Sequence, residues 1–451
     1  MSTKKTAKKV TKKATTKTSR RTNKTKARRA VIVAGARTPF VKAFGPFLKM
    51  DTIALGVAAV DGLLRQTELP RDEVESIVWG GVILPGFAPN VAREIALDLR
   101  LPPSVEGSTV TRACASGLQA ITNAAAAIER GDADVVIAGG SDSTSNAEIK
   151  LPQKVVHALA PLAFGKASPA DVVGVLAQMM PLSEILPQKP EIAERSTGEV
   201  MGEAAEKMAA RNEISREAQD EFAVRSHHRA AAAIASGRFD NEVVPVQTPD
   251  GRWVHQDMLV RGDTSVERLA KLRSVFAKNG TLTAGNSSPL TDGAAAVLLM
   301  SEEKALSLGY EPLAAIRDWS YVAVDPADQL LMGPALSMPK VADRAGLKLE
   351  DFGLVDIHEA FAAQVLSVLK MMGSEAFCQT RAGRDEAFGE IDPERLNVHG
   401  GSVSIGHPFG ATGARMVTTM ANELKLRDQQ FALLGLCAAG GLGASAILEH
   451  I

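Results

Sequence analysis

The sequence predicts an α/β fold made of two similar halves. Short apolar runs alternate with segments of helical periodicity from Ala30 onward, which is typical of helices packed on the faces of a sheet. The length of 451 residues exceeds what one simple core holds. The last third also repeats the first in outline. Both "VTRACASGLQAITNAAAAIERGDADVVIAGG" and "VSIGHPFGATGARMVTTMANELKLRDQQFALLGLCAAGG" give an Ala-rich helix followed by an apolar strand that ends in Gly-Gly.

The first half spans residues 30–150. Its short runs "AVIVAG", "SIVWGGV", "GSTVTR" and "ADVVIAGG" predict strands. The segments "DTIALGVAAVDGLLRQ" and "NVAREIALDLR" have helical spacing, and a further helix begins near Cys114 and runs to about Arg130. We expect residues 281–303, which contain "TLTAGNSSPLTDGAAAVLLMS", to complete this half.

Residues 151–280 predict a helical loop domain, because "GEAAEKMAARN" and "SREAQDEFAVRSHHRAAAAIASG" are charged helical segments. The second half spans residues 304–451. Within it, residues 431–448 form a stretch of 18 residues without a charge, the lower limit for a membrane-spanning helix. Gly440, Gly441 and Gly443 lie in the middle of this stretch. We therefore favour two buried strands joined by a glycine turn.

Basic residues gather at the N-terminus. Residues 1–29 hold 13 Lys and Arg and no Asp or Glu, in a Thr/Lys-rich segment that predicts a disordered basic tail. The rest of the chain has 38 basic and 52 acidic residues, a net charge of −14, which does not favour nucleic acid as its partner. Nucleic-acid or anionic-lipid binding by the tail is the alternative to a solubilising role.

Cysteine usage indicates a reducing compartment. Cys114, Cys378 and Cys437 are widely spaced, so they predict neither a disulfide framework nor a zinc site. Residues 1–30 contain no apolar run of a secretory signal. We expect the cytoplasm of a bacterium. A mitochondrial location is the second choice, since the tail is Lys-rich and lacks the apolar face of a transit peptide.

Four segments of the chain contain candidates for chemistry. Cys114 lies at a helix start, where first-turn amides and the helix dipole would lower the pKa of a thiol, although this stretch alone slightly favours a small buried residue. His407 lies in the Gly-rich turn "GHPFGATG", which suits an exposed, positioned base. Cys437 ends an apolar strand, and an inert thiol is the simpler interpretation there. His358 and Glu359 follow the strand "LVDI", where helix capping is the simpler interpretation.

These residues lie in motifs that together resemble those of the thiolase family. "CASGLQA" at residues 114–120 resembles the family's nucleophile motif. "TAGNSSPLTDGAA", "HEAF", "GGSVSIGHPFGATGAR" and "CAAGGLG" resemble its other motifs and come in the family's order. The match begins at "ARTPF", residues 36–40, and covers nearly everything outside the tail. The resemblance implies the thiolase fold, with two α/β halves in a five-layered α-β-α-β-α core and a helical loop domain.

The resemblance also implies an acyltransferase, acetyl-CoA C-acyltransferase. Such an enzyme cleaves a 3-ketoacyl-CoA with CoA, or runs the reverse Claisen condensation, through an acyl thioester on Cys114. His407 would take the thiol proton, and Cys437 would be the second acid/base. His358 with a bound water would stabilise an enolate oxygen, and the backbone N–H groups of Cys114 and Ala439 would form a second oxyanion hole. CoA and acetyl-CoA enter as substrates, with no bound cofactor and no metal.

Substrate contacts follow from the same resemblance: Ala284, Gly285 and Ser288 for the pantetheine arm and Met201 for the acyl pocket. Three features depart from the commoner family pattern. His358 stands where many members have Asn, His399 stands in "NVHGG" where Asn is commoner, and "GGSDSTSNAE" replaces a Met-rich run. "HEAF" with "GHPFGATGAR" and "CAAGGLG" resembles the degradative branch, the thiolase subunit of fatty-acid oxidation complexes.

That branch implies partners. We expect a homodimer or tetramer, with an enoyl-CoA hydratase/3-hydroxyacyl-CoA dehydrogenase subunit or a peripheral membrane contact. The apolar stretches "PQKVVHALAPLAFG" and "DVVGVLAQMMPLSEILP", within residues 151–195, are expected to dock one of these, unless they only cover the site.

Three rival functions stay open. The first is a short-chain acetoacetyl-CoA thiolase (acetyl-CoA C-acetyltransferase) that acts biosynthetically. The second is a ketosynthase-like condensing enzyme, which lacks an equivalent of Cys437. The third is an inert core behind a tail that binds nucleic acid or an anionic surface, against which the intact set of reactive residues argues.

Overall fold

The computed structural model describes residue 2, residues 28–165, residues 174 and 186, and residues 193–451. Most of the predicted basic tail and of the second apolar stretch lies outside these residues. The described strands are β1 (Ala30–Arg37), β2 (Val41–Lys42), β3 (Ser76–Gly80), β4 (Glu106–Val110), β5 (Val135–Ser143), β6 (Val246–Gln247), β7 (Trp253–Val254), β8 (Thr291–Ser301), β9 (Ala314–Ala323), β10 (Phe352–Ile357), β11 (Phe431–Ala438) and β12 (Leu442–Glu449).

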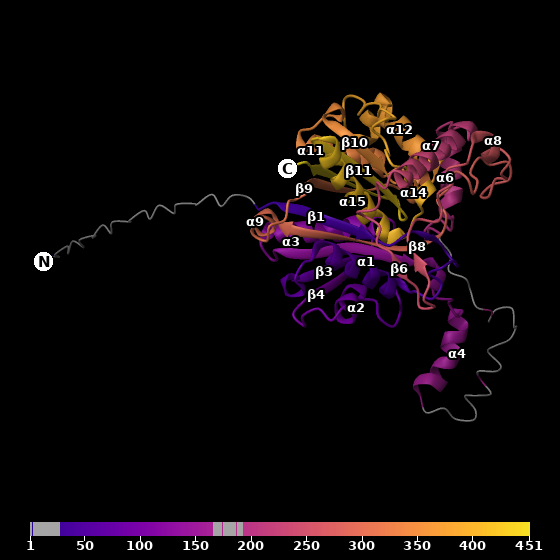
Figure 1. The fold of residues 1–451 in the computed structure, drawn as a ribbon. Coiled ribbons are helices and arrows are strands. Elements are labelled where there is room, and N and C mark those ends of the chain that lie inside the picture. The colour runs from indigo at the N-terminus through magenta and orange to yellow at the C-terminus, as the bar shows by residue number, and fades with distance from the viewer. Residues whose placement is uncertain (1, 3–27, 166–173, 175–185, 187–192) are drawn as a thin grey trace.

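The α-helices of the described residues are labelled in Figure 1 where there is room. They are α1 (Thr52–Thr67), α2 (Val91–Asp98), α3 (Ser116–Arg130), α4 (Gln153–Phe164), α6 (Met201–Arg211), α7 (Arg216–Ala235), α8 (Val266–Leu269), α9 (Glu302–Ser307), α10 (Pro326–Gln329), α11 (Pro334–Ala345), α12 (Ala362–Met372), α13 (Glu375–Phe377), α14 (Ser402–Ile405) and α15 (Phe409–Arg427).

Ten strands form one continuous sheet in the order β10-β11-β12-β9-β1-β8-β5-β3-β4, with β2 paired to β8. The two halves meet between β1 and β9, which pair at only two positions. Outward from this junction the halves match. β8 and β12 run antiparallel to the first strands, β5 and β11 run antiparallel to these, and β3 and β10 then add in parallel. The strand order therefore repeats, as two similar halves require.

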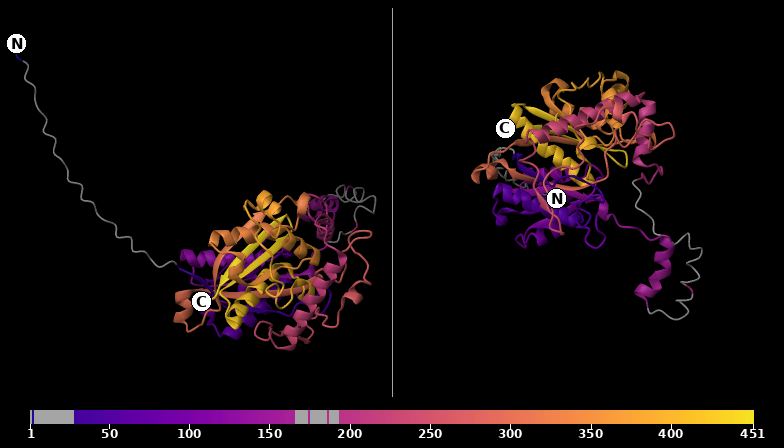
Figure 2. Two further views of the ribbon diagram at one scale, coloured as in Figure 1. Left: turned by 90° about the horizontal axis from the view of Figure 1, so that it is seen from above. Right: turned by 45° about the vertical axis from the view of Figure 1, so that its right-hand side comes forward.

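Helices form three layers around the two halves of the sheet (Figures 1 and 2). α1 and α2 pack on the outer face of the first half, and α11 packs on the outer face of the second. α3 and α15 lie between the halves and contact strands of both. Their Ala- and Gly-rich faces, with side chains such as Ala120, Ala124 and Ala421 in one buried cluster, let helix and sheet backbones approach closely. The predicted five-layered α-β-α-β-α arrangement is confirmed.

Local signals explain several boundaries. Asp51 caps α1, because its carboxylate accepts the N–H of Ala54 at 2.8 Å. Residues 431–448 form β11 and most of the antiparallel partner β12. Gly440 and Gly441 take φ values of 83° and 68° in the turn between them. The membrane-helix alternative for this stretch is wrong, and none of the described helices is long and apolar enough to cross a membrane.

The segment between the two parts of the first half carries most of the remaining helices. α6 and α7 pack against α12, and α7 also packs against α14, so this segment covers the end of the second half where β10 and β11 finish. The short hairpin of β6 and β7 was not predicted. α4 extends away from the layered core (Figure 2).

Candidate active site

Cys114 sits in a sharp turn between β4 and α3. The preceding Ala113 has a φ of 45°, a left-handed conformation that is strained for a residue with a Cβ. Ser116 holds the turn, since its Oγ accepts the N–H of Arg112 at 2.8 Å and donates to the Ala113 carbonyl at 2.6 Å. α3 begins only at Ser116, so Cys114 lies two residues before the helix rather than at its first residue.

The structure brings together the four reactive residues predicted from the sequence. Cys114 Sγ and one ring nitrogen each of His358 and His407 all lie within 4.8 Å of one another. The two imidazole rings have centroids 4.1 Å apart and are tilted by 42°. Cys437 lies near enough to Cys114 that a thiolate there raises its pKa. These side chains come from four segments: the turn before α3, the end of β10, the turn before α15 and the end of β11.

The hydrogen bonds of His407 define its tautomer. Nδ1 lies 2.6 Å from Thr412 Oγ1. The Thr412 hydroxyl donates its own proton to the Pro408 carbonyl at 3.1 Å, so it must accept the proton of Nδ1. The lone pair is then on Nε2, which is buried and has no hydrogen-bond partner among the described residues. A base with a free lone pair therefore faces the Cys114 thiol.

Contacts of the backbone also orient the His407 imidazole. The N–H of His407 donates to Thr291 Oγ1 at 3.0 Å, which ties the turn to the start of β8. Gly406 has a φ of 110°, and a Cβ there would lie 2.6 Å from Leu259 Cδ1. Only glycine fits this conformation and space. Gly406 and Thr291 together fix the backbone at His407 and therefore the direction of its side chain.

His358 is anchored in the same way. Its N–H donates to the Gly435 carbonyl at 2.8 Å, and its Nδ1 lies 3.0 Å from Ser402 Oγ. When the Ser402 hydroxyl is the donor of this bond, the ring N–H lies on Nε2, which is buried and without a partner in the described part of the chain. An N–H in that position is the donor that an enolate oxygen needs.

Glu359 holds the loop that carries Ser402. Its buried carboxylate accepts bonds from Ser226 Oγ at 2.7 Å, Asn397 Nδ2 at 2.7 Å and the Val403 N–H at 3.1 Å. Helix capping is the wrong interpretation of Glu359, because α12 begins three residues later without a side-chain cap. The carboxylate instead ties α7 and α14 to the end of β10, next to His358.

Burial keeps the reactive groups neutral. It raises the pKa of the Cys114 thiol to about 11, although the backbone N–H groups of Ala439 and of Cys114 itself favour the thiolate. The lowered pKa that the helix-start position suggested for this thiol is therefore wrong, because desolvation of the sulfur outweighs these hydrogen bonds. Burial also raises the pKa of Cys437 well above its ordinary value.

The two imidazoles shift in the opposite direction. Burial and, as a smaller effect, the positive charge of Arg415 together lower the pKa of His407 to about 3. Burial, His407 and Arg415 hold the pKa of His358 well below its ordinary value. His407 is therefore a buried base, not the exposed one expected. A neutral thiol beside a neutral imidazole transfers its proton only as the sulfur attacks.

Two further polar contacts were not predicted: a buried ion pair, and a contact between a histidine and a buried carboxylate. Arg415 Nη1 lies 3.1 Å from Asp356 Oδ2. His399 Nε2 lies 2.9 Å from Glu423 Oε1, and Glu423 also pairs with Arg238. The His at "NVHGG" thus has a structural partner, which gives that departure from the family pattern a physical reason.

The loop predicted to contact CoA lies beside these groups. The Ser288 N–H donates to the backbone carbonyl of residue 360 at 3.0 Å, and the Ala362 N–H donates to the Asn286 carbonyl at 2.9 Å. The loop is therefore paired with the segment that follows His358. Ala284 is exposed and Gly285 is buried at the tip of this loop.

Met201 is the first residue of α6 and is half-buried. It packs on the apolar cluster that contains Phe361 and Cys437. Phe276 packs on the same cluster, and its ring lies 5.8 Å from that of Phe361. Met201 thus packs on the same apolar cluster as Cys437 and is not part of the group of thiols and imidazoles.

The chain belongs to the thiolase family. The model of the thiolase N-terminal domain matches residues 30–303, and that of the thiolase C-terminal domain matches residues 310–450. Together these domains cover the layered core and every reactive residue described above. The chain is therefore an acyltransferase of the thiolase family and has the thiolase fold.

Named relatives are found among bacteria. The chain is 43% identical over 427 residues to a 3-ketoacyl-CoA thiolase of Shewanella frigidimarina, covering 94% of this chain and 98% of the relative. It is 43% identical to a 3-ketoacyl-CoA thiolase of Photobacterium profundum over 94% of this chain and 97% of the relative.

Solved structures agree in fold. The acetyl-CoA acetyltransferase of Bacillus anthracis superposes with a TM-score of 0.79 at 34% identity, covering 94% of this chain and 99% of that one. The human mitochondrial 3-ketoacyl-CoA thiolase in complex with CoA superposes with a TM-score of 0.78 at 29% identity, covering 94% and 98%.

Proposed function

We infer that the protein catalyses the CoA-dependent cleavage of 3-ketoacyl-CoA to acetyl-CoA and a shortened acyl-CoA in fatty-acid β-oxidation. One observation supports the inference most strongly. A ring nitrogen of His407 lies within 4.8 Å of Cys114 Sγ. The unpartnered nitrogen of this ring is Nε2, and Cys437 interacts with the same thiol. The names of the bacterial relatives at 43% identity support the degradative reaction.

The first half-reaction forms the acyl-enzyme. As Cys114 Sγ attacks the 3-keto carbonyl, its proton passes to His407 Nε2. The backbone N–H groups of Cys114 and Ala439, which already favour the anion at this sulfur, are the proposed donors to the oxyanion. The bond between C2 and C3 of the substrate then breaks, and the electron pair forms an enolate of acetyl-CoA. His358 Nε2–H stabilises the enolate oxygen, and the Cys437 thiol protonates the carbon.

The second half-reaction releases the acyl group. The Cys437 thiolate takes the proton of an incoming CoA thiol, which attacks the acyl thioester. Cys114 leaves as a thiolate and recovers its proton from the His407 imidazolium. Protons and electrons balance over the cycle, so the chemistry needs no redox partner. In the reverse direction the same groups perform the Claisen condensation.

CoA is proposed to lie along the loop of residues 283–288. Ala284, Gly285 and Ser288 are the proposed pantetheine contacts, and Met201 is proposed to line the acyl pocket. A surface depression of about 530 Å³ is lined by residues 273–279, which include Phe276 of the same apolar cluster as Met201. Arg273 and Lys278 belong to its lining and suit the phosphates of CoA. The relative solved with CoA bound supports this use of the fold.

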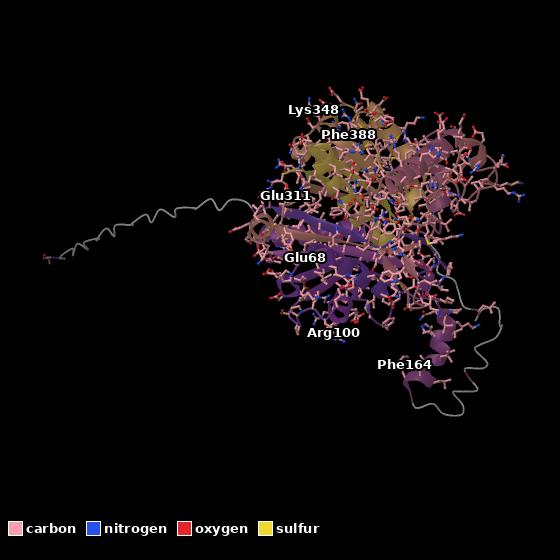
Figure 3. The ribbon with its side chains drawn as sticks, viewed as in Figure 1. Glu68, Arg100, Phe164, Glu311, Lys348 and Phe388 are labelled. Atoms are coloured by element: carbon pink, nitrogen blue, oxygen red, sulfur yellow. The ribbon has the colours of Figure 1, made fainter. Side chains whose placement is uncertain are left out.

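The degradative branch also implies contacts outside the chain. We propose a homodimer or tetramer in the cytoplasm of a bacterium, with α4 and the segment after it as the contact for a hydratase/dehydrogenase subunit or a membrane surface. α4 supports this because it stands away from the core and carries exposed apolar residues (Figure 3). Phe164 at its end is 92% exposed, and Val156 is 42% exposed.

The docking proposal has its own test. Replacing Val156 and Phe164 by Ser should leave thiolysis in solution unchanged and weaken binding to the partner subunit or to vesicles. Retention of both binding activities in the double variant contradicts the proposed role of α4. Leu306→Ser on α9 is the matched control, because it replaces an exposed apolar residue (60% exposed) on a different helix.

A second candidate is a short-chain acetyl-CoA acetyltransferase, supported by the 34% identical Bacillus anthracis structure. Thiolysis of a series from acetoacetyl-CoA to long-chain 3-ketoacyl-CoA separates the two. The proposed function requires turnover of the longer substrates, and cleavage of acetoacetyl-CoA alone favours the second candidate. Cys114→Ala is the matched control, and unchanged turnover in this variant would overturn the mechanism.

A further inference from the structure

Asp142 is a buried carboxylate near the site that the mechanism does not use. It lies in β5 within "GGSDSTSNAE", the stretch that departs from the family pattern. Its side chain is fully buried. Oδ1 accepts the N–H groups of Val82 at 2.9 Å and Ile83 at 2.5 Å, and Oδ2 accepts the N–H of Gly410 at 2.6 Å. All three hydrogen-bond partners that the structure gives this carboxylate are backbone groups.

One of these partners connects Asp142 to the catalytic base. Gly410 lies in the first turn of α15, between His407 and Thr412. The backbone of this turn is tightly packed, because a Cβ on Gly410 would lie 2.6 Å from the Gly80 carbonyl oxygen. A carboxylate at a helix N-terminus also interacts favourably with the helix dipole. The position of this turn relative to the first half therefore depends on the Asp142 carboxylate.

We propose that Asp142 is a positioning residue for the thiol–imidazole pair, because its carboxylate holds the first turn of α15, and with it the His407 ring, against the half of the molecule that carries Cys114. The inference rests on the proposed thiolase reaction. It also gives the "GGSDSTSNAE" stretch a role, since this segment joins the loop after β3, the end of β5 and the start of α15.

Electrostatics support the same role. The negative charge of Asp142 raises the pKa of Cys114, in addition to the larger effect of burial. Burial raises the pKa of Asp142 itself to about 6, so the carboxylate is ionised at neutral pH. The other titratable or charged groups around the pair are His358, Cys437 and Arg415. Asp142 thus favours the neutral form of the thiol.

The test compares Asp142→Asn with Ser143→Ala. Asn keeps the volume and the acceptor for two N–H groups, but it turns an amide NH₂ toward the Gly410 N–H. Ser143 is the next residue of the same strand, is equally buried, and donates instead to the Met50 carbonyl at 3.0 Å. Two quantities are measured: kcat for thiolysis, and the pH midpoint of iodoacetamide labelling at Cys114, with Cys114→Ala as background.

For Asp142→Asn we expect kcat to fall on the order of 10- to 100-fold, as for a small misplacement of a catalytic group, with the KM for CoA changed by less than about twofold. The labelling midpoint should fall by about one pH unit, because a like charge near the thiol is removed. Ser143→Ala should move neither quantity, even where its melting temperature falls. A purely structural role for Asp142 predicts a loss of stability with kcat and midpoint as in Ser143→Ala, and that result overturns the proposal.

Asp142→Glu provides a second arm if the Asn variant does not fold. It keeps the charge and places a longer side chain against the tightly packed first turn of α15. We expect a wild-type labelling midpoint with a lowered kcat, and wild-type kcat in this variant contradicts the positioning role. Labelling needs no substrate, so failure of the proposed function, seen as absent thiolysis by the wild type, is distinguishable from failure of this inference.

Discussion

Thr412 offers the sharpest test of the proposed proton transfer, through the substitution Thr412→Val. Valine has nearly the same shape, so the packing of α15 against β5 and β8 is kept. The change removes the one oxygen that accepts the Nδ1 proton of His407 at 2.6 Å. The ring then has a buried Nδ1–H without an acceptor, or changes tautomer and loses the lone pair on Nε2.

The size of the effect follows from burial. His407 and Thr412 are both buried, and a buried donor without an acceptor costs about 1–3 kcal/mol. If this cost applies to the productive tautomer, kcat falls by roughly 5- to 150-fold. The KM values for both substrates should change little, because Thr412 contacts the base and no predicted substrate position.

Steady-state thiolysis of a 3-ketoacyl-CoA, followed by loss of the substrate's enolate absorbance, measures this effect. Thr412→Ser is the matched control, since it keeps the hydroxyl and removes a methyl group. We expect the Ser variant to retain most of the activity that the Val variant loses. Equal activity of the Val variant and the wild type would refute the assignment of the tautomer, and with it the role of His407 Nε2 as base.

Three further outcomes are expected. Iodoacetamide labelling of Cys114 in the free enzyme should keep rising above pH 9, because the thiol pKa is raised to about 11, and a plateau below pH 8 contradicts a buried neutral thiol. Since the folded-state pKa of His407 is lowered from 6.5 to about 3, the unfolded chain binds more protons below about pH 6.5, and stability is lost as pH falls through this window. Between about pH 7 and 5, the melting temperature of His407→Asn should therefore fall less than that of the wild type. Equal decreases would contradict a neutral buried ring. Asp257→Ala should lower the free energy of unfolding by about 3–5 kcal/mol in chemical denaturation, because it removes the partner 2.6 Å from the buried Arg37 guanidinium. A change below about 1 kcal/mol would show that water reaches this pair.

Periodicity and turn residues alone determined most of the fold. Alternating apolar runs and helical segments predicted the strands and helices of both halves, because burial on a sheet face or helix stripe imposes these periods on the sequence. The glycines at residues 440 and 441 marked the turn between β11 and β12, since their positive φ values exclude most other residues. The motifs around Cys114 and His407 were identified differently, by their joint resemblance to motifs of the thiolase family, because neither stretch taken alone is decisive.

The tertiary structure decided the chemical state of the site. The sequence placed Cys114 at a helix start and so predicted a lowered thiol pKa, whereas the folded chain surrounds its sulfur with protein and raises that pKa. Thr412, Ser402 and Asp142 were not predicted as partners of the site, although Thr412 follows His407 by only five residues. Hydrogen-bond partners and desolvation depend on segments that are far apart in the chain, such as β5 and α15, so they exist only once the two halves pack together.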